Sequence, residues 1–382
     1  MKKIAVFAGT RPEGIKMAMV IKALEQADDF EPIVISTGQH REMLDQVVKI
    51  FDLNVDHDLE VMQPNQTLAS LSSRLMDRVD ALLDNIQPDM ALVQGDTTTV
   101  LMASLACFYR QIPVGHVEAG LRTGNMRSPF PEEANRRLAA PLMDLHFPPT
   151  SLSQQNLLDE GLAADTIHVT GNTVIDALFR EVEQQKAPAI QAEVDAELSG
   201  CLPDNWREKP YVLVTGHRRE NFGGGFEQIC DALVQLAKRF PDHEFIYPVH
   251  LNPNVQGPVY ETLRGLENIH LIPPQGYRVF VALMTYSKLI LTDSGGVQEE
   301  APSLGKPVLV MRDTTERPEG VDAGTVKLVG ADAEEIVSNA VELLEDDAAY
   351  QAMASAQNPY GDGQASERIL TALRSYFALG SA

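Results

Sequence analysis

Two acidic residues stand at the ends of predicted strands, where carboxyl groups can act on a ligand. Asp96 follows one apolar run, in QGDTTT, and Glu118 follows the next, in GHVEAGLRTG. Parallel strands end at one edge of their sheet, so the two side chains are expected to converge. Two carboxyl groups in one site are a candidate pair for general acid and base catalysis. For Asp96 and its threonines, an ordinary helix N-cap is the alternative.

Further charged residues lie in SPFPEEANRRLAAPLMD. Glu132 and Arg136 are four residues apart, as are Glu133 and Arg137, so each pair lies on one face of a predicted helix. Such pairs are either surface ion pairs, which contribute little to stability, or functional groups of a site. Spacing alone leaves both interpretations open.

A cluster of cationic and titratable residues follows a predicted strand in the second half of the chain. His217, Arg218 and Arg219 stand together in VLVTGHRREN, ahead of a glycine-rich helix start. In a chain with a net charge of −23, such a cluster favours a functional role over a structural one. His250 ends the next predicted strand, in YPVHLNPNV, where a structural and a regulatory role both stay open.

The segment LTDSGGVQEEAPSLGKPVLVMRDTTERPE has the features of a nucleotide-sugar site. Residues 294–296 (Ser-Gly-Gly) stand between a predicted strand and a predicted helix, where backbone amides can approach a diphosphate closely. Glu300, one turn further on, could accept both hydroxyl groups of a ribose, and Arg317 supplies positive charge without a metal. Glu299 is interpreted as an acid that complements the helix dipole.

The first predicted strand is followed by GTRPEGIK, which contains a tight turn and two cations. This is not a P-loop, because Ile15 displaces the lysine to position 16 and no Ser or Thr follows it. It is not a dinucleotide fingerprint either, because GxGxxG is missing and the second strand ends without an acidic residue. Arg11 and Lys16 near a helix start predict an anion site, with a solvated turn as the alternative.

The sequence predicts no metal and no other cofactor. The nine histidines include no HExxH or other close ligand spacing, and the three cysteines have no CxxC spacing. Cys107, Cys201 and Cys230 are interpreted as packing or surface thiols. Asp56 and Asp58 form a DxD sequence that could hold a metal-bound nucleotide, but no strong strand precedes it, so a metal role is disfavoured.

The elements that position these residues alternate between apolar strands and helices. This alternation predicts parallel sheets, and the continuous apolar character of the runs predicts helices on both faces. A chain of 382 residues is long enough for two domains, and a cleft between two such halves would be lined by the loops at the strand ends. The fold class is therefore α/β, with two Rossmann-like domains. The runs are KIAVFA, EPIVIS, DMALVQ, IPVGHVE, DLHFPP, YVLVTG, EFIYPV, NIHLIP, KLILTD and KPVLVM.

The domain boundary is expected near residue 170, just before GNTVIDALF. The polar segment 180–210 is then an excursion of the second domain, and the last helical stretch, ERILTALRSYFALG, could cap either domain. The net charge disfavours nucleic acid or an anionic membrane as a partner, and no apolar run approaches the ~18 residues that span a bilayer. The amino-terminal segment is interpreted as a first strand, so a cytoplasmic location is expected.

Taken together, the motifs resemble the bacterial non-hydrolysing UDP-N-acetylglucosamine 2-epimerases. The resemblance runs in order along essentially the whole chain, through GTRPEGIK, GDTTT, HVEAGLRTG, PEEANR, TGHRREN, YPVHLNPNV, TDSGGVQEEAPSLGKPVLVMRDTTERPE and NPYGDG. It implies the GT-B fold, a homodimer, no cofactor, and an isomerase that interconverts UDP-N-acetylglucosamine (UDP-GlcNAc) and UDP-N-acetylmannosamine (UDP-ManNAc) for bacterial surface polysaccharide. It also implies that the carboxyl-terminal helix returns to the first domain. The expected domains are then 1–170 with 364–382, and 171–363.

The resemblance further assigns roles to individual residues. Some relatives carry a second, allosteric UDP-GlcNAc site near a QHR loop, but this chain has Glu42 where they have glutamine, so regulation stays open. The catalytic set that the resemblance implies is Asp96, Glu118, Glu132, Arg136 and His217. The nucleotide-sugar-binding set is Arg11, Lys16, Gln275, Phe280, Ser294, Gly295, Gly296, Glu300 and Arg317.

Chemistry favours a particular route for this reaction. The C2 proton of a sugar is too weakly acidic to remove directly, and the chain lacks a nicotinamide fingerprint for transient oxidation. Loss of UDP together with the C2 proton gives a 2-acetamidoglucal. Re-addition of UDP, with the proton delivered to the other face of C2, then inverts C2. Three alternatives are a GT-B glycosyltransferase, a hydrolysing epimerase that releases free ManNAc, and a non-catalytic UDP-sugar sensor. The dense set of carboxyl groups disfavours the glycosyltransferase and the sensor.

Overall fold

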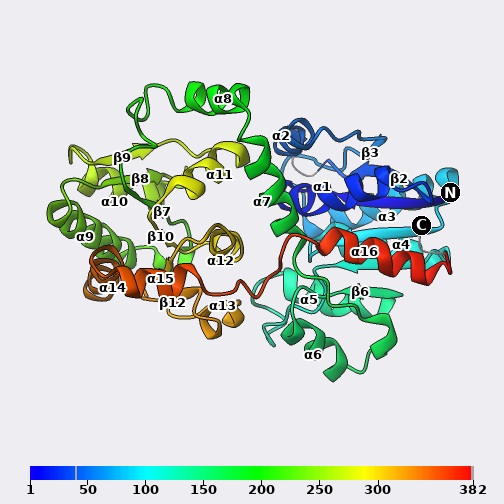
Figure 1. Ribbon diagram of the computed structural model, residues 1–382. Helices are drawn as coiled ribbons and strands as arrows, with labels where there is room; N and C mark the ends of the chain where they lie inside the picture. The colour runs from blue at the N-terminus through cyan, green and yellow to red at the C-terminus, as the bar shows by residue number, and fades with distance from the viewer. Residues whose placement is uncertain (39–40, 380–382) are drawn as a thin grey trace. The chain divides into compact units, whose positions relative to one another are not determined.

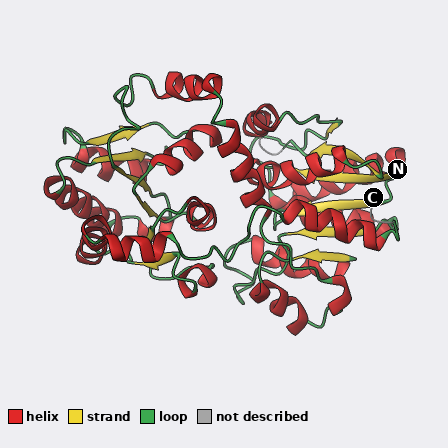
Figure 2. Cartoon of the chain, in the orientation of Figure 1, coloured by secondary structure: helices red, strands yellow, loops and turns green. Residues whose placement is uncertain are grey.

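The computed structural model describes residues 1–38 and 41–379, and the side chains of all of these except residues 41–44. The chain divides into two compact units (Figure 1). Unit 1 comprises Met1–Ala177 and Tyr360–Ala382, and unit 2 comprises Leu178–Pro359. In each unit, helices flank a sheet, as the colouring by secondary structure shows (Figure 2).

The sheet of unit 1 has six parallel strands in the order β3-β2-β1-β4-β5-β6. The chain builds outward from β1 through β2 to β3, then returns to β4 on the other side of β1. The order therefore reverses between β1 and β4. The strands are β1 (Lys2–Ala8), β2 (Phe30–Ser36), β3 (His57–Asp58), β4 (Met90–Gln94), β5 (Val114–Val117) and β6 (Leu145–Phe147).

Threonines begin most of the long helices of unit 1. At α1, the Thr10 hydroxyl accepts the Glu13 N–H and the Glu13 carboxylate accepts the Thr10 N–H, which is a capping box, and Pro12 fits the first turn. Thr97 caps α4 and Thr150 caps α6 without a capping box: each hydroxyl accepts one backbone N–H of the first turn. The helices are α1 (Arg11–Gln26), α2 (Arg41–Phe51), α3 (Leu68–Ile86), α4 (Thr98–Tyr109), α5 (Glu132–Ala139), α6 (Ser151–Asp159), α7 (Thr173–Gln184, which runs into unit 2) and α16 (Ala365–Tyr376), with short 3-10 turns at Ala140–Leu142 and Ala164–Thr166.

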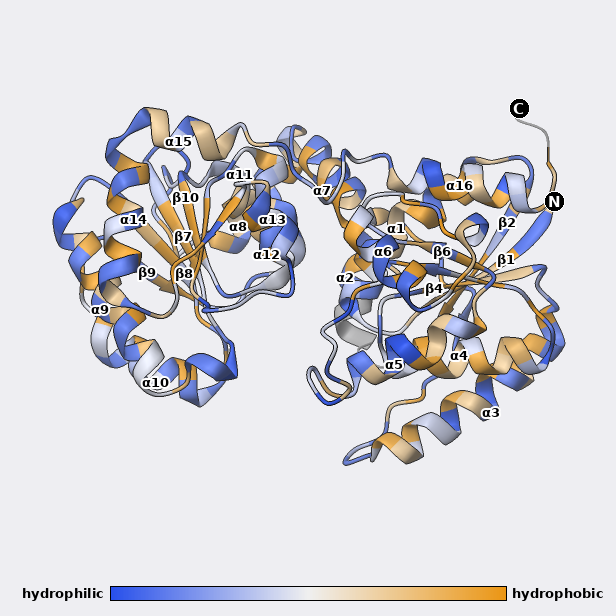
Figure 3. Ribbon diagram, turned by 90° about the horizontal axis from the view of Figure 1, so that it is seen from below, coloured by the Kyte–Doolittle hydropathy of each residue, from blue (hydrophilic) through white to orange (hydrophobic). Residues whose placement is uncertain are grey.

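Both faces of the unit 1 sheet are buried. Along β1, Ile4 and Val6 pack into one apolar cluster with α1 and α16, while Ala5 and Phe7 pack into another with α3 and α4. Successive side chains of a strand point to opposite faces, so a strand covered on both sides reads as a continuous apolar run. The hydropathy colouring shows these apolar strands inside each unit (Figure 3).

Unit 2 repeats this plan with strand order β12-β11-β10-β7-β8-β9, again all parallel. The order reverses between β7 and β10. The strands are β7 (Tyr211–Thr215), β8 (Glu244–Pro248), β9 (Ile269–Ile272), β10 (Leu289–Thr292), β11 (Val308–Val310) and β12 (Val326–Leu328). The helices are α8 (Pro188–Leu198), α9 (Gly224–Arg239), α10 (Pro253–Leu263), α11 (Tyr277–Tyr286), α12 (Gly295–Glu300), α13 (Pro318–Asp322), α14 (Ala333–Glu345) and α15 (Asp347–Ala354), with 3-10 turns at Arg219–Asn221 and Ala301–Leu304.

The expected α/β class with two Rossmann-like parallel sheets is confirmed, and these are the two halves of a GT-B fold. Each of the ten apolar runs contains a strand, whereas the edge strands β3 and β12 were not predicted. Within the described residues, no helix combines the length and apolar character needed to cross a membrane.

The structure divides the chain a few residues away from the expected positions 170 and 364. Residues 171–177 lie with unit 1 because Asn172 donates its backbone N–H to the Tyr360 carbonyl. The Asp176 carboxylate also accepts the N–H groups of Ala365 and Ser366 at the start of α16. These hydrogen bonds connect the segment 172–176 with the segment 360–366, and both segments belong to unit 1.

Candidate active site

The candidate residues lie where the strand order of each sheet reverses. In unit 1, Arg11 follows β1, and Asp96 follows β4. In unit 2, His217 follows β7, and Ser294 follows β10. Loops at such a point diverge to opposite sides of the sheet, and ligands of doubly wound folds bind there. Each unit therefore presents one candidate site.

Glu118 is the centre of the site in unit 1. Its carboxylate Oε1 lies 2.5 Å from the Lys16 ammonium and accepts a hydrogen bond of 3.2 Å from the Asn172 amide. Its Oε2 accepts a hydrogen bond from the Gln94 amide. The Glu118 side chain is 7% exposed, so this carboxylate is held nearly out of water by donors from three different elements.

The backbone of Glu118 has an unusual conformation. Its φ of +61° lies in the left-handed region, which costs a residue with a side chain roughly 1 kcal/mol or more. The Glu118 N–H is still bonded to the Phe147 carbonyl at the end of β6. Two residues later, Gly120 also has positive φ, and a Cβ there would lie 2.2 Å from the Ser153 carbonyl oxygen of α6. Strain at a strand end is typical of functional positions.

An ion pair brings Asp96 and Arg136 together, whereas the expected convergence of Asp96 and Glu118 stays a prediction. The Arg136 Nη1 donates to Asp96 Oδ2 at 2.9 Å, and the Asn135 amide donates to the Asp96 carbonyl. Thr97, and not Asp96, is the N-cap of α4. Arg136 of α5 therefore positions the Asp96 carboxylate.

Neither pair of charges that are four residues apart on α5 forms an ion pair within the described residues. Arg136 pairs with Glu133, three residues away, with Nη2 to Oε2 at 2.7 Å. Glu133 has no exposed surface, and it also accepts the N–H groups of Thr123 and Gly124, so it turns toward the loop that follows β5. Arg137 pairs with Glu160 of the loop after α6. Glu132 is half-buried, and no ion pair to it occurs within the described part of the chain.

Glu13 is a site residue that the sequence argument did not identify. Its carboxylate accepts the N–H groups of Gly9 and Thr10 and the Thr97 hydroxyl, so it joins the loop after β1 to the start of α4. Burial raises its pKa, and these hydrogen bonds oppose that rise. Glu13 therefore fixes the turn that carries Arg11, at the first residue of α1, and Lys16 one turn further.

In unit 2, Arg317 lies against the glycine turn that begins α12. A Cβ added to Gly295 would be 2.5 Å from Nη1 of Arg317, so only glycine leaves room for the guanidinium. A Cβ on Gly296 would make only ordinary contacts, the nearest at 3.7 Å with the Glu300 carboxylate. Ser294 is the N-cap, and its own N–H donates to the Thr292 hydroxyl.

The helix-dipole interpretation of Glu299 is wrong. Glu299 is the fifth residue of α12, outside the first turn, and its Oε1 accepts from Nε of Arg317 at 2.6 Å. Its side chain is buried. Glu299 therefore orients Arg317 over Gly295 and is part of the candidate anion site.

Glu300 has a buried partner that the sequence argument missed. The Tyr277 hydroxyl donates to Glu300 Oε1 at 3.2 Å. Burial and the neighbouring Glu300 carboxylate raise the pKa of Tyr277 well above its usual value, so it remains a donor. Tyr277 begins α11, which also carries the half-buried Phe280. Gln275 stands before α11 and donates its amide to the Pro273 carbonyl.

His217 lies beside a buried carboxylate. Its Nδ1 is 3.3 Å from Oδ1 of Asp293, and its ring stacks on His250 with centroids 5.5 Å apart. Burial lowers the pKa of His217, Asp293 opposes this, and Arg218 and His250 add to the lowering. The contact with His250 brings together the two histidines that the sequence analysis singled out.

The described residues contain no group of three or more His, Cys, Asp or Glu side chains that could hold a metal ion. The two carboxylates of the DxD sequence have structural partners, because Asp56 accepts the Val34 N–H and Asp58 accepts the Glu60 N–H. The expectation about Glu42 falls on a side chain outside the described ones.

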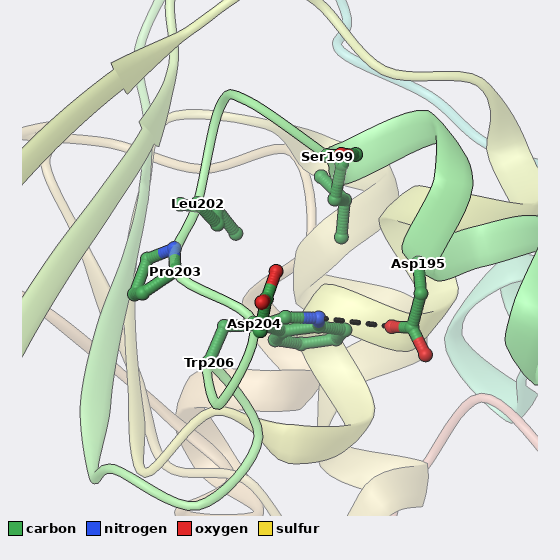
Figure 4. A pocket seen from close by; sticks show the side chains of 7 residues that line it. Asp195, Ser199, Leu202, Pro203, Asp204 and Trp206 are labelled. Carbon is green, nitrogen blue, oxygen red and sulfur yellow. Dashed lines mark hydrogen bonds between the residues drawn. The ribbon is translucent and has the colours of Figure 1, made fainter.

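A separate cavity of about 220 Å³ lies in unit 2, within the loop that follows α8 (Figure 4). Its wall includes Trp206, whose indole N–H donates to Asp195 at 3.1 Å. None of the candidate residues lines this cavity, so it is distinct from the two sites described above.

Known proteins of similar sequence and fold identify the family. A family model for UDP-N-acetylglucosamine 2-epimerase matches residues 22–374. The UDP-N-acetylglucosamine 2-epimerases of Yersinia pestis and Escherichia coli strain K12 are each 56% identical to this chain, over 377 residues (98% of this chain, 99% of the relative) and 375 residues (98% of each). The crystal structure of the UDP-GlcNAc 2-epimerase from Neisseria meningitidis bound to UDP-GlcNAc has a TM-score of 0.89 at 50% identity, covering 98% of this chain and 100% of that one. The chain belongs to the UDP-N-acetylglucosamine 2-epimerase family.

Proposed function

We propose that this chain interconverts UDP-GlcNAc and UDP-ManNAc by elimination and re-addition of UDP. The observation that supports this most strongly is the Glu118 site, a strained strand end whose carboxylate collects Lys16, Gln94 and Asn172. A protein that only bound a nucleotide sugar would need no such carboxylate. The Neisseria relative, solved with UDP-GlcNAc, supports the choice of substrate.

In the proposed reaction the C1–O bond to UDP breaks, and the C2 hydrogen leaves as a proton, giving a 2-acetamidoglucal and UDP. UDP then adds back at C1 while a proton is delivered to the opposite face of C2. Two faces require two proton carriers, or one carrier and a relay. The Lys16 ammonium beside Glu118 favours the carboxylate form, which is the form of a general base.

The remaining catalytic roles fall to other residues of the proposed set. Asp96, held by Arg136, and the half-buried Glu132 are the further carboxyl groups in unit 1, and His217 is a titratable group of unit 2. Arg136 bonds to both Glu133 and Asp96, so it positions a proton carrier. In this proposal, arginine and lysine side chains supply the positive charge, so the proposed reaction includes no metal ion.

The proposed nucleotide contacts come largely from unit 2. Arg317 with the amides of Ser294, Gly295 and Gly296 would hold the diphosphate, which is the leaving group, and stabilise its developing charge. Glu300, oriented by Tyr277, would accept the ribose hydroxyls. Gln275, Phe280, Arg11 and Lys16 complete the proposed binding set.

We also propose a homodimer that acts in the bacterial cytoplasm and supplies ManNAc nucleotide for surface polysaccharide. Unit 1 exposes several large apolar side chains on adjacent helices, including Phe108 (55%) and Tyr109 (68%) on α4 and Leu138 (56%) on α5. Large apolar side chains exposed on neighbouring helices favour a subunit contact there.

The test is to incubate the protein with UDP-GlcNAc and resolve the products by proton NMR. We expect UDP-ManNAc to appear until an equilibrium mixture is reached, with no net release of UDP. Free ManNAc with equimolar UDP would instead identify a hydrolysing epimerase. UDP that accumulates only with an added sugar acceptor would identify a glycosyltransferase, and unchanged UDP-GlcNAc would leave a binding protein.

A further inference from the structure

The carboxylate of Asp293 is a buried partner for the His217 ring. Asp293 follows β10 and has no exposed surface. Its Oδ2 accepts the backbone N–H groups of His217 and Arg218, at 2.8 Å each. Its Oδ1 lies 3.3 Å from Nδ1 of His217, and within the described part of the chain this buried oxygen accepts no hydrogen bond. One oxygen thus holds the loop after β7, and the other faces the imidazole.

This arrangement selects one tautomer of His217. A buried carboxylate oxygen is costly unless a donor reaches it, and Nδ1–H of His217 is the donor at hand. With the proton on Nδ1, the lone pair is on Nε2, the nitrogen away from Asp293. The His217 side chain is 42% exposed, so a ligand can reach it.

The other charged or titratable groups near His217 are Arg218 and His250. Nδ1 of His250 accepts the Asn252 N–H at 3.1 Å, so His250 carries its proton on Nε2. Burial, Arg218 and His250 all disfavour the charged form of His217, and Asp293 is the neighbour that favours it. Asp293 is therefore suited to support a proton that His217 takes up transiently.

We propose that Asp293 is a positioning residue, which holds His217 with its proton on Nδ1 so that Nε2 can accept and return a proton of the bound nucleotide sugar. This rests on the proposed function for the part that His217 plays. While Nε2 holds the transferred proton, the ring is an imidazolium whose charge Asp293 balances. Asp293 itself touches no reacting atom.

The first test is nitrogen-15 NMR of the ligand-free protein, which reports the tautomer of His217 directly. We expect the proton on Nδ1 in the natural chain. In Asp293→Asn, one side-chain oxygen can still accept the two backbone N–H groups, while the amide NH₂ faces Nδ1 and favours a proton on Nε2. The imidazole pKa should fall, because the variant loses the anion that favours the charged form of His217. A natural chain with its proton on Nε2, or a variant with an unchanged tautomer, would overturn the proposal.

Kinetics separate positioning from a structural effect. We expect kcat of Asp293→Asn to fall roughly 10- to 100-fold, with the Kd for UDP within about 2-fold of the natural value. Combining Asp293→Asn with His217→Gln should lower kcat no further than His217→Gln alone. A multiplicative loss in the double variant would mean that Asp293 acts independently of His217, which overturns the proposal.

Asp176→Asn is the matched control. Asp176 is also a buried carboxylate that accepts two backbone N–H groups, here from Ala365 and Ser366, but among the described residues no histidine contacts it. Its neutralisation should leave kcat within about 2-fold, and a loss as large as that of Asp293→Asn would overturn the proposal. If the tautomer of Asp293→Asn changes while kcat does not, the positioning geometry stands and His217 leaves the proposed catalytic set.

Discussion

The two units share one strand order and one place for their candidate site, but their loops converge on different chemistry. In unit 1 the loops meet at a carboxylate, Glu118, which amides and a lysine hold from three sides. In unit 2 they meet at a glycine turn, where the Arg317 guanidinium fills the space that a Cβ on Gly295 would take. The same scaffold thus presents a candidate proton carrier in one unit and a candidate anion receptor in the other.

The comparison also shows how each site is kept in place. Neighbouring acids position the cations in both units, since Glu133 holds Arg136 and Glu299 holds Arg317. Both acids are buried, and neither was predicted for this role. If these assignments are correct, changes at Glu118 of unit 1 should lower turnover, and changes at the glycine turn of unit 2 should mainly lower nucleotide affinity.

The largest effect is expected for Glu118→Gln. This change nearly preserves shape but removes a proton carrier, so kcat should fall by roughly 10²-fold or more while the Kd for UDP changes little. Asp96→Asn should behave in the same way. Steady-state kinetics and calorimetry measure the two quantities separately.

Glu160→Gln is the control for this change. Glu160 is also an acid of unit 1, paired with Arg122 and Arg137, and it is outside the proposed site. The kcat of the Glu160→Gln variant should stay within about 2-fold of that of the natural chain. Undiminished kcat in both Glu118→Gln and Asp96→Asn would remove these two residues from the proposed proton carriers.

A smaller effect, on affinity, is expected for Arg317→Ala. A charge-assisted contact to phosphate in a partly desolvated site is worth about 1.5 to 3 kcal/mol, so the Kd for UDP should rise roughly 10- to 150-fold. Gly295→Ala should reproduce part of this loss by displacing the guanidinium, and Gly296→Ala should have a smaller effect.

Arg239→Ala is the matched control for the loss of an arginine. Arg239 is a half-exposed residue of α9 that pairs with Glu345. By calorimetry, the Arg239→Ala variant should bind UDP with the same Kd as the natural chain. Equal affinities of Arg317→Ala and Arg239→Ala would place the diphosphate elsewhere.

The smallest effect is expected for Tyr277→Phe. Loss of the hydrogen bond to Glu300 should weaken UDP binding by about 0.5 to 1.5 kcal/mol, roughly 2- to 12-fold. The penalty should shrink for 2′-deoxy-UDP, because Glu300 then has fewer ribose hydroxyls to accept. Tyr211→Phe, which removes another buried hydroxyl bonded to the Leu283 carbonyl, should leave UDP affinity unaltered. The same penalty for UDP and 2′-deoxy-UDP would argue against ribose recognition by Glu300.

Much of the fold could be predicted because buried parallel strands are continuous apolar runs. The two missed strands are short edge strands with polar residues, His57–Asp58 in β3 and Lys327 in β12, which carry no such signal. The boundary differs by a few residues because Asn172 and Asp176 form hydrogen bonds with Tyr360 and Ala365, which are remote from them in the sequence. These bonds decide that residues 171–177 join unit 1.

The sequence was enough to single out several residues of the candidate site, but not the partners that these residues contact. Strand ends point to Asp96, Glu118 and His217 because the topology of a doubly wound sheet brings strand ends together. The partners come from far along the chain, such as Asn172, which is 54 residues from Glu118, and no local spacing reports such contacts. On α5, spacing allowed either Glu132 or Glu133 to meet Arg136, and only the fold of the loop after β5 selects Glu133.

The most direct test of the proposed chemistry is the fate of hydrogen at C2. The protein is incubated with UDP-GlcNAc in D₂O without added nicotinamide cofactor, and the recovered UDP-sugars are analysed by NMR. Elimination and re-addition through separate proton carriers predicts deuterium at C2 of the UDP-ManNAc that forms. UDP-ManNAc that retains full protium at C2 would contradict the account, because the hydrogen would then have been transferred without leaving for a solvent-exchanging group.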